Sequence, residues 1–180
     1  MTRPANAPSY EEDFVAWLED QAQRARRGEA GELDLCNIAE ELEGMARSDR
    51  REIRNRLIVL LVHLLKYSAQ PRRRSSGWLA TIGEQRSRIA TVIDDSPCLK
   101  SFPGSILEQC YVGARSRAAL KTGLPESDFP ERCPFGADEV LDPRWLPVTP
   151  ARAADDAVAG EDRRSGQTAP AGSGSRGRKP

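Results

Sequence analysis

HLLKYSAQPRRRSSGWLATIGEQRSRI, residues 63–89, decides the fold because it joins two helix-forming segments through a proline corner. Gln70-Pro71 ends the first segment, since proline disfavours the helical conformation in the residue before it. Ser75 or Ser76 begins the second segment. In the first segment, apolar residues recur at three- and four-residue spacing and so form a stripe along one side of a helix. They are Ile53, Leu57, Leu60, Leu64 and Tyr67. The stretch therefore predicts a helix, a corner and a second helix.

Two helices are predicted before this stretch. Ser9-Tyr10-Glu11-Glu12 has the pattern of a capping box and predicts a helix start, with Gly28 as its stop. Asp34 is positioned to cap a second helix, whose apolar stripe is Leu35, Ile38, Leu42 and Met45. Ser48-Asp49 then offers a new cap for a third helix from Arg50 to about Ala69. A single bent helix over residues 35–69 is the alternative interpretation.

The remainder of the chain is predicted to form one more helix and a strap. After the helix that carries Trp78, Ile82 and Ile89, a fifth helix is expected over Pro103–Thr122, with Gly123 as its C-cap. Prolines interrupt residues 124–146, which predicts an irregular strap with one helical turn near Ala137–Leu141.

No stretch alternates apolar and polar residues as a half-buried strand would. We therefore expect an all-α fold, a single helical bundle of about five helices with an irregular C-terminal strap and a disordered tail. The expected organisation is a flexible N-terminus over 1–8, one helical domain over 9–147 and a low-complexity tail over 148–180, where large apolar residues are almost absent.

Charge is segregated although the formal net charge of the 180 residues is zero. Residues 1–45 carry 4 basic and 11 acidic side chains, whereas residues 46–91 carry 11 basic and 3 acidic ones. This pattern has two interpretations, charge complementarity between packed helices or a basic surface for an anionic partner. The first is the one we favour.

Cysteine spacing and hydropathy indicate a cytoplasmic protein without a metal or a membrane segment. Cys36, Cys98, Cys110 and Cys133 have neither CxxC spacing nor neighbouring histidines, so no zinc site is expected. Residues 1–8 lack the profile of a signal peptide, and the longest apolar run, Leu57–Val62, is far shorter than the roughly 18 residues of a membrane span.

Polar residues on the shoulders of the third and fourth helices suggest a candidate groove. If those helices form an antiparallel hairpin, the shoulders meet in a groove lined by His63, Gln70, Arg74, Thr81, Glu84 and Arg88. Arginine binds phosphate or carboxylate groups, and histidine transfers protons near neutral pH. The structural alternative is that His63 hydrogen-bonds a carboxylate or a carbonyl between helices while Glu84 pairs with Arg88.

A second candidate is an anion-binding corner formed by Arg72, Arg73 and Arg74 beside Trp78, which has the charges and the stacking ring used for nucleic acids. Trp78 also lies on an apolar stripe, which favours a core position. A metal site in a helical bundle would draw on Glu40, Glu41, Glu43, His63 and Glu84. Because His63 lacks a glutamate three residues earlier, no metal ligand and no cofactor are predicted.

Four blocks of the sequence resemble the bacterial family known as domain of unknown function twenty-nine. They are YEEDFVAWLEDQA (10–22), DLCNIAEELEGMARSDRREI (34–53), residues 63–89 with DDSPCL (94–99), and TGLPESDFPERCPFGADEVLDPRWLP (122–147). The resemblance covers residues 10–147 and implies a compact helical domain, with no established activity and no catalytic residues to carry over. Cys36 departs from the family pattern, which usually has a polar residue there.

We therefore predict an uncharacterised small helical protein of the cytoplasm that acts as a non-enzymatic interaction or regulatory module with a protein partner. A nucleic-acid-binding or processing protein that uses the corner Arg72–Arg74 is the less favoured alternative. A further alternative is a small hydrolase-like enzyme with an anion site near His63 and Glu84, although the sequence favours a role other than catalysis. The sequence assigns no oligomeric state.

Overall fold

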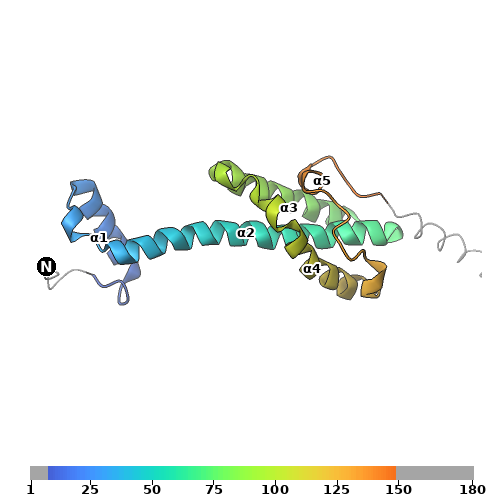
Figure 1. Ribbon diagram of the computed structural model, residues 1–180, viewed down its shortest axis with the longest axis horizontal. Helices are drawn as coiled ribbons and strands as arrows, with labels where there is room; N and C mark the ends of the chain where they lie inside the picture. The colour runs from blue at the N-terminus through green and yellow to red at the C-terminus, as the bar shows by residue number, and fades with distance from the viewer. Residues whose placement is uncertain (1–7, 149–180) are drawn as a thin grey trace, which may run out of the picture. The chain divides into compact units, whose positions relative to one another are not determined.

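A computed structural model of the chain describes residues 8–148 (Figure 1). Its helices are α1 (Phe14–Arg27), α2 (Leu35–Ala69), α3 (Ser76–Asp95), α4 (Phe102–Thr122) and α5 (Ala137–Leu141), with short 3-10 turns between them. Residues 8–148 contain no β-strand, and the predicted all-α fold is confirmed. The expected flexible N-terminus and low-complexity tail lie outside the described residues, apart from Pro8 and Val148.

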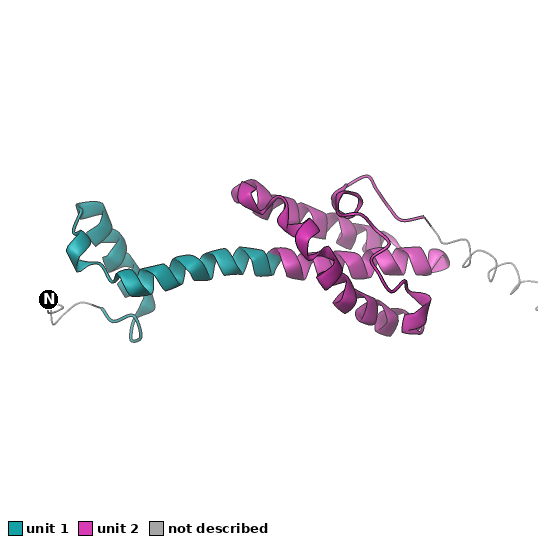
Figure 2. Ribbon diagram, in the orientation of Figure 1, with its two compact units in different colours: residues 1–52 teal, residues 53–180 magenta. Residues whose placement is uncertain are grey.

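The chain divides into two compact units, unit 1 over Met1–Glu52 and unit 2 over Ile53–Pro180 (Figure 2). Helix α2 contributes residues 35–52 to unit 1 and residues 53–69 to unit 2. The division falls inside the helical domain expected over residues 9–147, whose boundaries stay a prediction.

Helix α1 begins at Phe14, so the capping box predicted at Ser9 is wrong. Asp13 is the N-cap, and its side chain accepts a hydrogen bond of 3.0 Å from the backbone N–H of Ala16. A carboxylate directly before the first turn satisfies an orphan amide and suits the helix dipole, which explains why Asp13 displaces Ser9. At the other end Gly28 has a φ of 76°, and the predicted stop is confirmed.

Helix α2 is one continuous helix of 35 residues, as the alternative interpretation had it, and the break predicted at Ser48-Asp49 is absent. Serine and aspartate favour helix starts but do not clash with a helix interior, whereas proline does. The sequence has no proline between Pro8 and Pro71, and α2 ends at Ala69, just before Gln70-Pro71, as predicted.

The core of unit 2 is formed where α2, α3 and α4 bury their apolar stripes against one another. Ile53, Leu57, Leu60 and Leu64 of α2 are fully buried, and Ile82 and Ile89 of α3 lie in the same cluster. From α4 the cluster receives Cys110, Tyr111, Ala114 and Ala118. The predicted caps Ser75 and Gly123 are both observed, the latter with a φ of 73°.

The strap after α4 is held on the core by side chains that bind its backbone. Arg86 of α3 is 6% exposed and donates to the carbonyls of Val140 at 2.8 Å and Trp145 at 2.9 Å. The Tyr111 hydroxyl donates to the Pro130 carbonyl at 2.7 Å. The predicted turn at Ala137–Leu141 is α5. These bonds let an irregular segment satisfy its backbone polar groups while it covers the core.

No helix among the described residues has the length and the apolar character that a membrane crossing requires.

Candidate functional site

His63 lies on α2 in a setting that keeps its ring neutral. Its Nδ1 donates to the Val59 carbonyl one turn earlier, at 2.9 Å. Because a carbonyl only accepts, Nδ1 carries the proton and Nε2 of the neutral ring is an acceptor. Burial lowers the pKa of His63, and the charges of Lys66 and Lys121 lower it further. The structural alternative expected His63 to bond between helices, but the carbonyl that it contacts belongs to its own helix.

Lys66 and Lys121 bring positive charge from two helices to the side of His63. The ammonium group of Lys66 lies 4.2 Å from the centroid of the Trp78 ring, a cation–π contact. Burial lowers the pKa of Lys66, and Lys121 lowers it too. Trp78 is half-buried and carries a lysine on its face, so the core position favoured from the sequence is only partly realised. We call Lys66 and Lys121, together with the neutral His63 beside them, the cationic cluster.

The other residues of the predicted groove make separate contacts, one between helices and the others within α3. The Gln70 side-chain amide donates to the Thr122 carbonyl at 3.1 Å, at the C-terminal end of α4. Thr81 donates to the carbonyl of Gly77 at 3.0 Å within α3. Glu84 and Arg88 form the predicted ion pair along α3, at 4.0 Å with both side chains exposed. A groove shared by all these residues stays a prediction.

The predicted anion-binding corner lies in the 3-10 turn Pro71–Arg73 and at the following residue. Arg72, Arg73 and Arg74 are exposed. The Arg74 guanidinium stacks 4.0 Å from the Tyr67 ring centroid, and its Nε donates to the Tyr67 carbonyl at 3.0 Å. Arg74 therefore also caps the end of α2, where a positive charge meets unpaired carbonyl groups.

Unit 1 carries a set of exposed apolar side chains. Its two helices meet through a few side chains. Trp17 is 1% exposed, Gln21 accepts a hydrogen bond of 2.8 Å from the backbone N–H of Asp34, and the Tyr10 hydroxyl bonds to Glu41. Beyond these contacts the large apolar side chains of both helices are exposed, namely Phe14, Val15, Leu18, Leu35, Leu42 and Met45.

The second helix therefore carries the predicted apolar stripe, which consists of Leu35, Ile38, Leu42 and Met45. Most of this stripe is exposed in the single chain. Leu35 is 63% exposed, Leu42 62% and Met45 67%, whereas Ile38 is half-buried. Periodicity detects an apolar face and is silent about what covers it. The sequence shows that this helix is amphipathic, but it does not show which surface packs against the apolar side.

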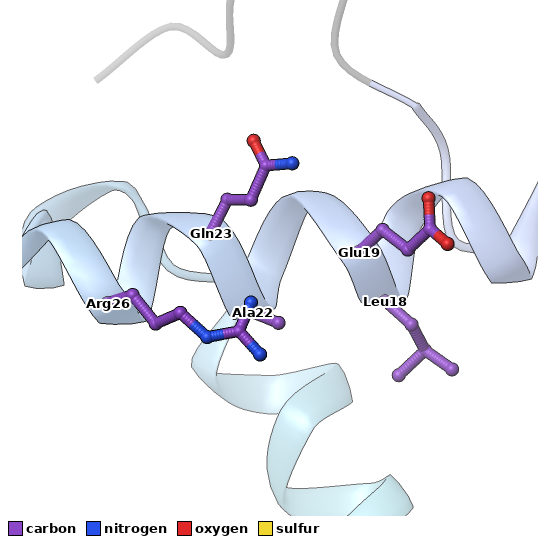
Figure 3. Close-up of a pocket in the computed structure, with 5 residues that line it drawn as sticks. All are labelled: Leu18, Glu19, Ala22, Gln23 and Arg26. Atoms are coloured by element: carbon purple, nitrogen blue, oxygen red, sulfur yellow. The ribbon is translucent and has the colours of Figure 1, made fainter.

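A shallow surface hollow on α1 adjoins this apolar side of unit 1. It is lined by Leu18, Glu19, Ala22, Gln23 and Arg26, all from one helix (Figure 3). Leu18 and Ala22 lie one turn apart on one side of the helix, and Glu19 and Gln23 project from the other. The hollow is open and is lined by both apolar and polar side chains of a single helix, which suits contact with another side chain better than enclosure of a small substrate.

The four cysteines are free thiols. Burial raises the pKa of both the Cys110 and the Cys133 thiol, which keeps them protonated and weakly reactive at neutral pH. Within residues 8–148 no three histidine, cysteine or acidic side chains come together in an arrangement able to hold a metal ion.

The sequence of this chain matches one protein-family model, described as "Domain of unknown function DUF29", over residues 9–146. No curated protein and no solved structure matches the chain.

Proposed function

The chain belongs to the family of the domain of unknown function DUF29, and we propose that it is a non-enzymatic interaction module whose contact surface lies on unit 1. The observation that supports this proposal is the set of exposed apolar side chains on α1 and on residues 35–46 of α2. We place this activity in the cytoplasm, in line with the free cysteines.

Physical chemistry favours a partner for this surface. Complete burial of one leucine or methionine side chain is worth roughly 1.5–3 kcal/mol relative to exposure. Leu35, Leu42 and Met45 each leave more than half of their surface in water, so most of that stabilisation is realised only when another protein covers them. Contiguous exposed apolar surfaces on soluble proteins are typically interaction sites.

A photoreactive amino acid placed at position 42 of the full chain tests the proposal in cells. We expect ultraviolet light to produce a covalent adduct with a protein. The matched control is position 120, because Leu120 on α4 is also an exposed leucine, at 85%, but lies in unit 2. An adduct at neither position, or equally at both, would contradict a specific contact surface on unit 1.

Catalysis provides a separate test of the non-enzymatic role. His63 has the proton-transfer chemistry that the hydrolase alternative requires. A reproducible turnover activity that His63→Ala abolishes while the circular dichroism spectrum is unchanged would overturn the proposal.

A second candidate function is binding of nucleic acid, and the cationic cluster favours it. The charge of Lys121 on α4 lowers the pKa of Lys66 on α2, and the charges of both lysines lower the pKa of His63. The neighbouring turn adds Arg72 and Arg73. Phosphate groups would relieve the repulsion between the lysines and release counterions on binding.

This second function predicts binding that weakens steeply with salt. Fluorescence anisotropy with a labelled single-stranded RNA and a DNA of the same sequence would measure it at about 50 and 200 mM salt. Replacing Lys66 and Lys121 by glutamine should weaken binding about tenfold or more, whereas Arg26→Gln, an exposed change in unit 1, should not. Failure of either nucleic acid to bind at the lower salt concentration would eliminate this candidate.

A further inference from the structure

We propose that the partner of unit 1 is a second copy of this chain, docked through residues 35–46 of α2 with the two helices antiparallel. The inference rests on the proposed function, because it names the occupant of the same apolar surface. The order of large and small residues on that surface favours a second copy.

Four apolar residues form one line along the exposed side of α2. Leu35, Ala39, Leu42 and Ala46 follow one another at spacings of four, three and four residues. At about 100° per residue they lie within about 60° of one another around the helix. All four are exposed in the described chain. We call this set the Leu/Ala line.

The Leu/Ala line is complementary to itself when reversed. An antiparallel copy centred between Glu40 and Glu41 places Leu35 opposite the second copy's Ala46 and Ala39 opposite its Leu42. Each of the four levels then pairs a large side chain with a small one, which fills the space between the helices evenly. A parallel, in-register copy would instead place alanine opposite alanine and leave two levels underfilled.

Neighbouring residues extend the same contact. Ile38 and Met45 flank the line on one side. In the antiparallel pairing, Ile38 of one copy lies two residues, about 3 Å, from the level of Met45 of the second copy. The reversed arrangement is a two-fold contact, so it closes at a dimer and leaves no open end. A stable interface buries roughly 800 Å² per partner, and α1 in the same unit carries further exposed apolar side chains, Phe14, Val15 and Leu18.

Two of the three acidic residues near the centre of the pairing have a partner within their own chain. Glu43 is bridged by Arg47 at 3.1 Å. Glu41 accepts the hydrogen bond of Tyr10, and Glu40 projects about 140° away from Leu35 around the helix. Repulsion between the two copies is thereby reduced, and the apolar line sets the geometry.

Sedimentation equilibrium of the full chain tests the inference. We expect twice the monomer mass of 19.8 kDa. Leu42→Glu should raise the dimer dissociation constant by roughly 100-fold or more, because two carboxylates would enter an apolar interface. Leu120→Glu is the matched control, a change from exposed leucine to glutamate in unit 2, and should leave the dimer intact.

The direction of pairing is tested by Ala39→Leu. In the antiparallel dimer the new leucine meets Leu42 of the second copy, and the dissociation constant should rise about tenfold through overpacking. In a parallel dimer it would meet another leucine at an underfilled level, and binding would tighten. The double variant Ala39→Leu/Leu42→Ala exchanges large and small residues across the antiparallel contact and should restore most of the affinity.

Three results would overturn the inference, namely a monomer at all concentrations, a dimer indifferent to Leu42→Glu, or a dimer strengthened by Ala39→Leu. A monomer whose position 42 still cross-links to a different protein would remove the second copy as the occupant and leave the proposed function standing. A monomer that also gives no adduct from position 42 would contradict both.

Discussion

Replacing Arg86 by methionine should destabilise unit 2 strongly, although it removes a charge from an apolar environment. The Arg86 guanidinium is buried in the protein and bonds to backbone carbonyls of the strap, at 2.8 Å to Val140 and 2.9 Å to Trp145. A third contact, to Glu139 at 3.5 Å, is long and contributes little. Methionine fills part of the volume but donates no hydrogen bond.

The magnitude follows from two opposing effects. Hydrogen bonds from a charged donor are worth about 1.5–3 kcal/mol each, so loss of the two short bonds costs about 3–6 kcal/mol. Burial lowers the pKa of Arg86, which indicates a desolvation cost that the variant no longer bears. A net loss of about 2–4 kcal/mol remains, or roughly 5–15 °C in Tm.

Urea denaturation followed by circular dichroism measures this loss, with Arg88→Met as the matched control. Arg88 lies on the same helix, with its side chain 59% exposed and 4.0 Å from Glu84, so its replacement should change the free energy of unfolding by no more than about 0.5 kcal/mol. Arg86→Lys should fall between the wild type and Arg86→Met, because an ammonium group reaches fewer of the carbonyls. Equal stabilities of Arg86→Met and Arg88→Met would refute the reasoning.

Three further measurements address other positions. Tyr111→Phe should lower the free energy of unfolding in urea by about 1–2 kcal/mol, because the Pro130 carbonyl loses its donor. Burial raises the pKa of Tyr111 to about 12, so the wild type should also lose stability as the pH rises from 10 to 12. The phenylalanine variant should lack that component of the loss. Because the pKa of His63 is lowered, the folded state favours the neutral ring, and the wild type should lose stability as the pH falls below 6.5 through the folded pKa. His63→Gln should lose less stability over the same pH range. Equal pH profiles of stability for the two proteins would contradict the assignment. Gly123→Ala should lower the free energy of unfolding by about 1 kcal/mol, because Gly123 has a φ of 73°. Gly83→Ala inside α3, where an added Cβ meets open space, should raise it by about 0.5–1 kcal/mol. Thermal unfolding that ranks the two variants the other way would be inconsistent with the observed backbone.

Local chemistry predicted most helix ends in unit 2, because each end is determined by residues within one turn of it. Ser75 caps α3, Gly123 ends α4, and Pro71 follows the end of α2 as expected. The start of α1 was predicted wrongly because both Ser9 and Asp13 are residues that can cap a helix. Asp13 lies closer to the first apolar turn and is the observed cap. At Ser48-Asp49 a cap signal was present without a helix breaker, so α2 continues.

Long-range contacts explain what the sequence could not predict. The partners of Arg86 are more than 50 residues away along the chain, and no local pattern marks an arginine that binds backbone carbonyls. The cationic cluster depends on Lys66 and Lys121, which belong to different helices and were not among the predicted site residues. The apolar stripe on residues 35–45 was visible, but helical periodicity does not reveal whether the covering surface belongs to the same chain.

Oxidation of Met45 tests most directly whether the Leu/Ala line is covered by protein. Met45 flanks that line, is 67% exposed in the single chain and is one of two methionines, so peptide mass spectrometry isolates its sulfoxide. We predict that the rate of oxidation by dilute peroxide falls several-fold as the protein concentration rises through the dimer dissociation constant, and that Leu42→Glu removes this protection. A rate that is independent of concentration, and equal in the wild type and Leu42→Glu, would contradict the account.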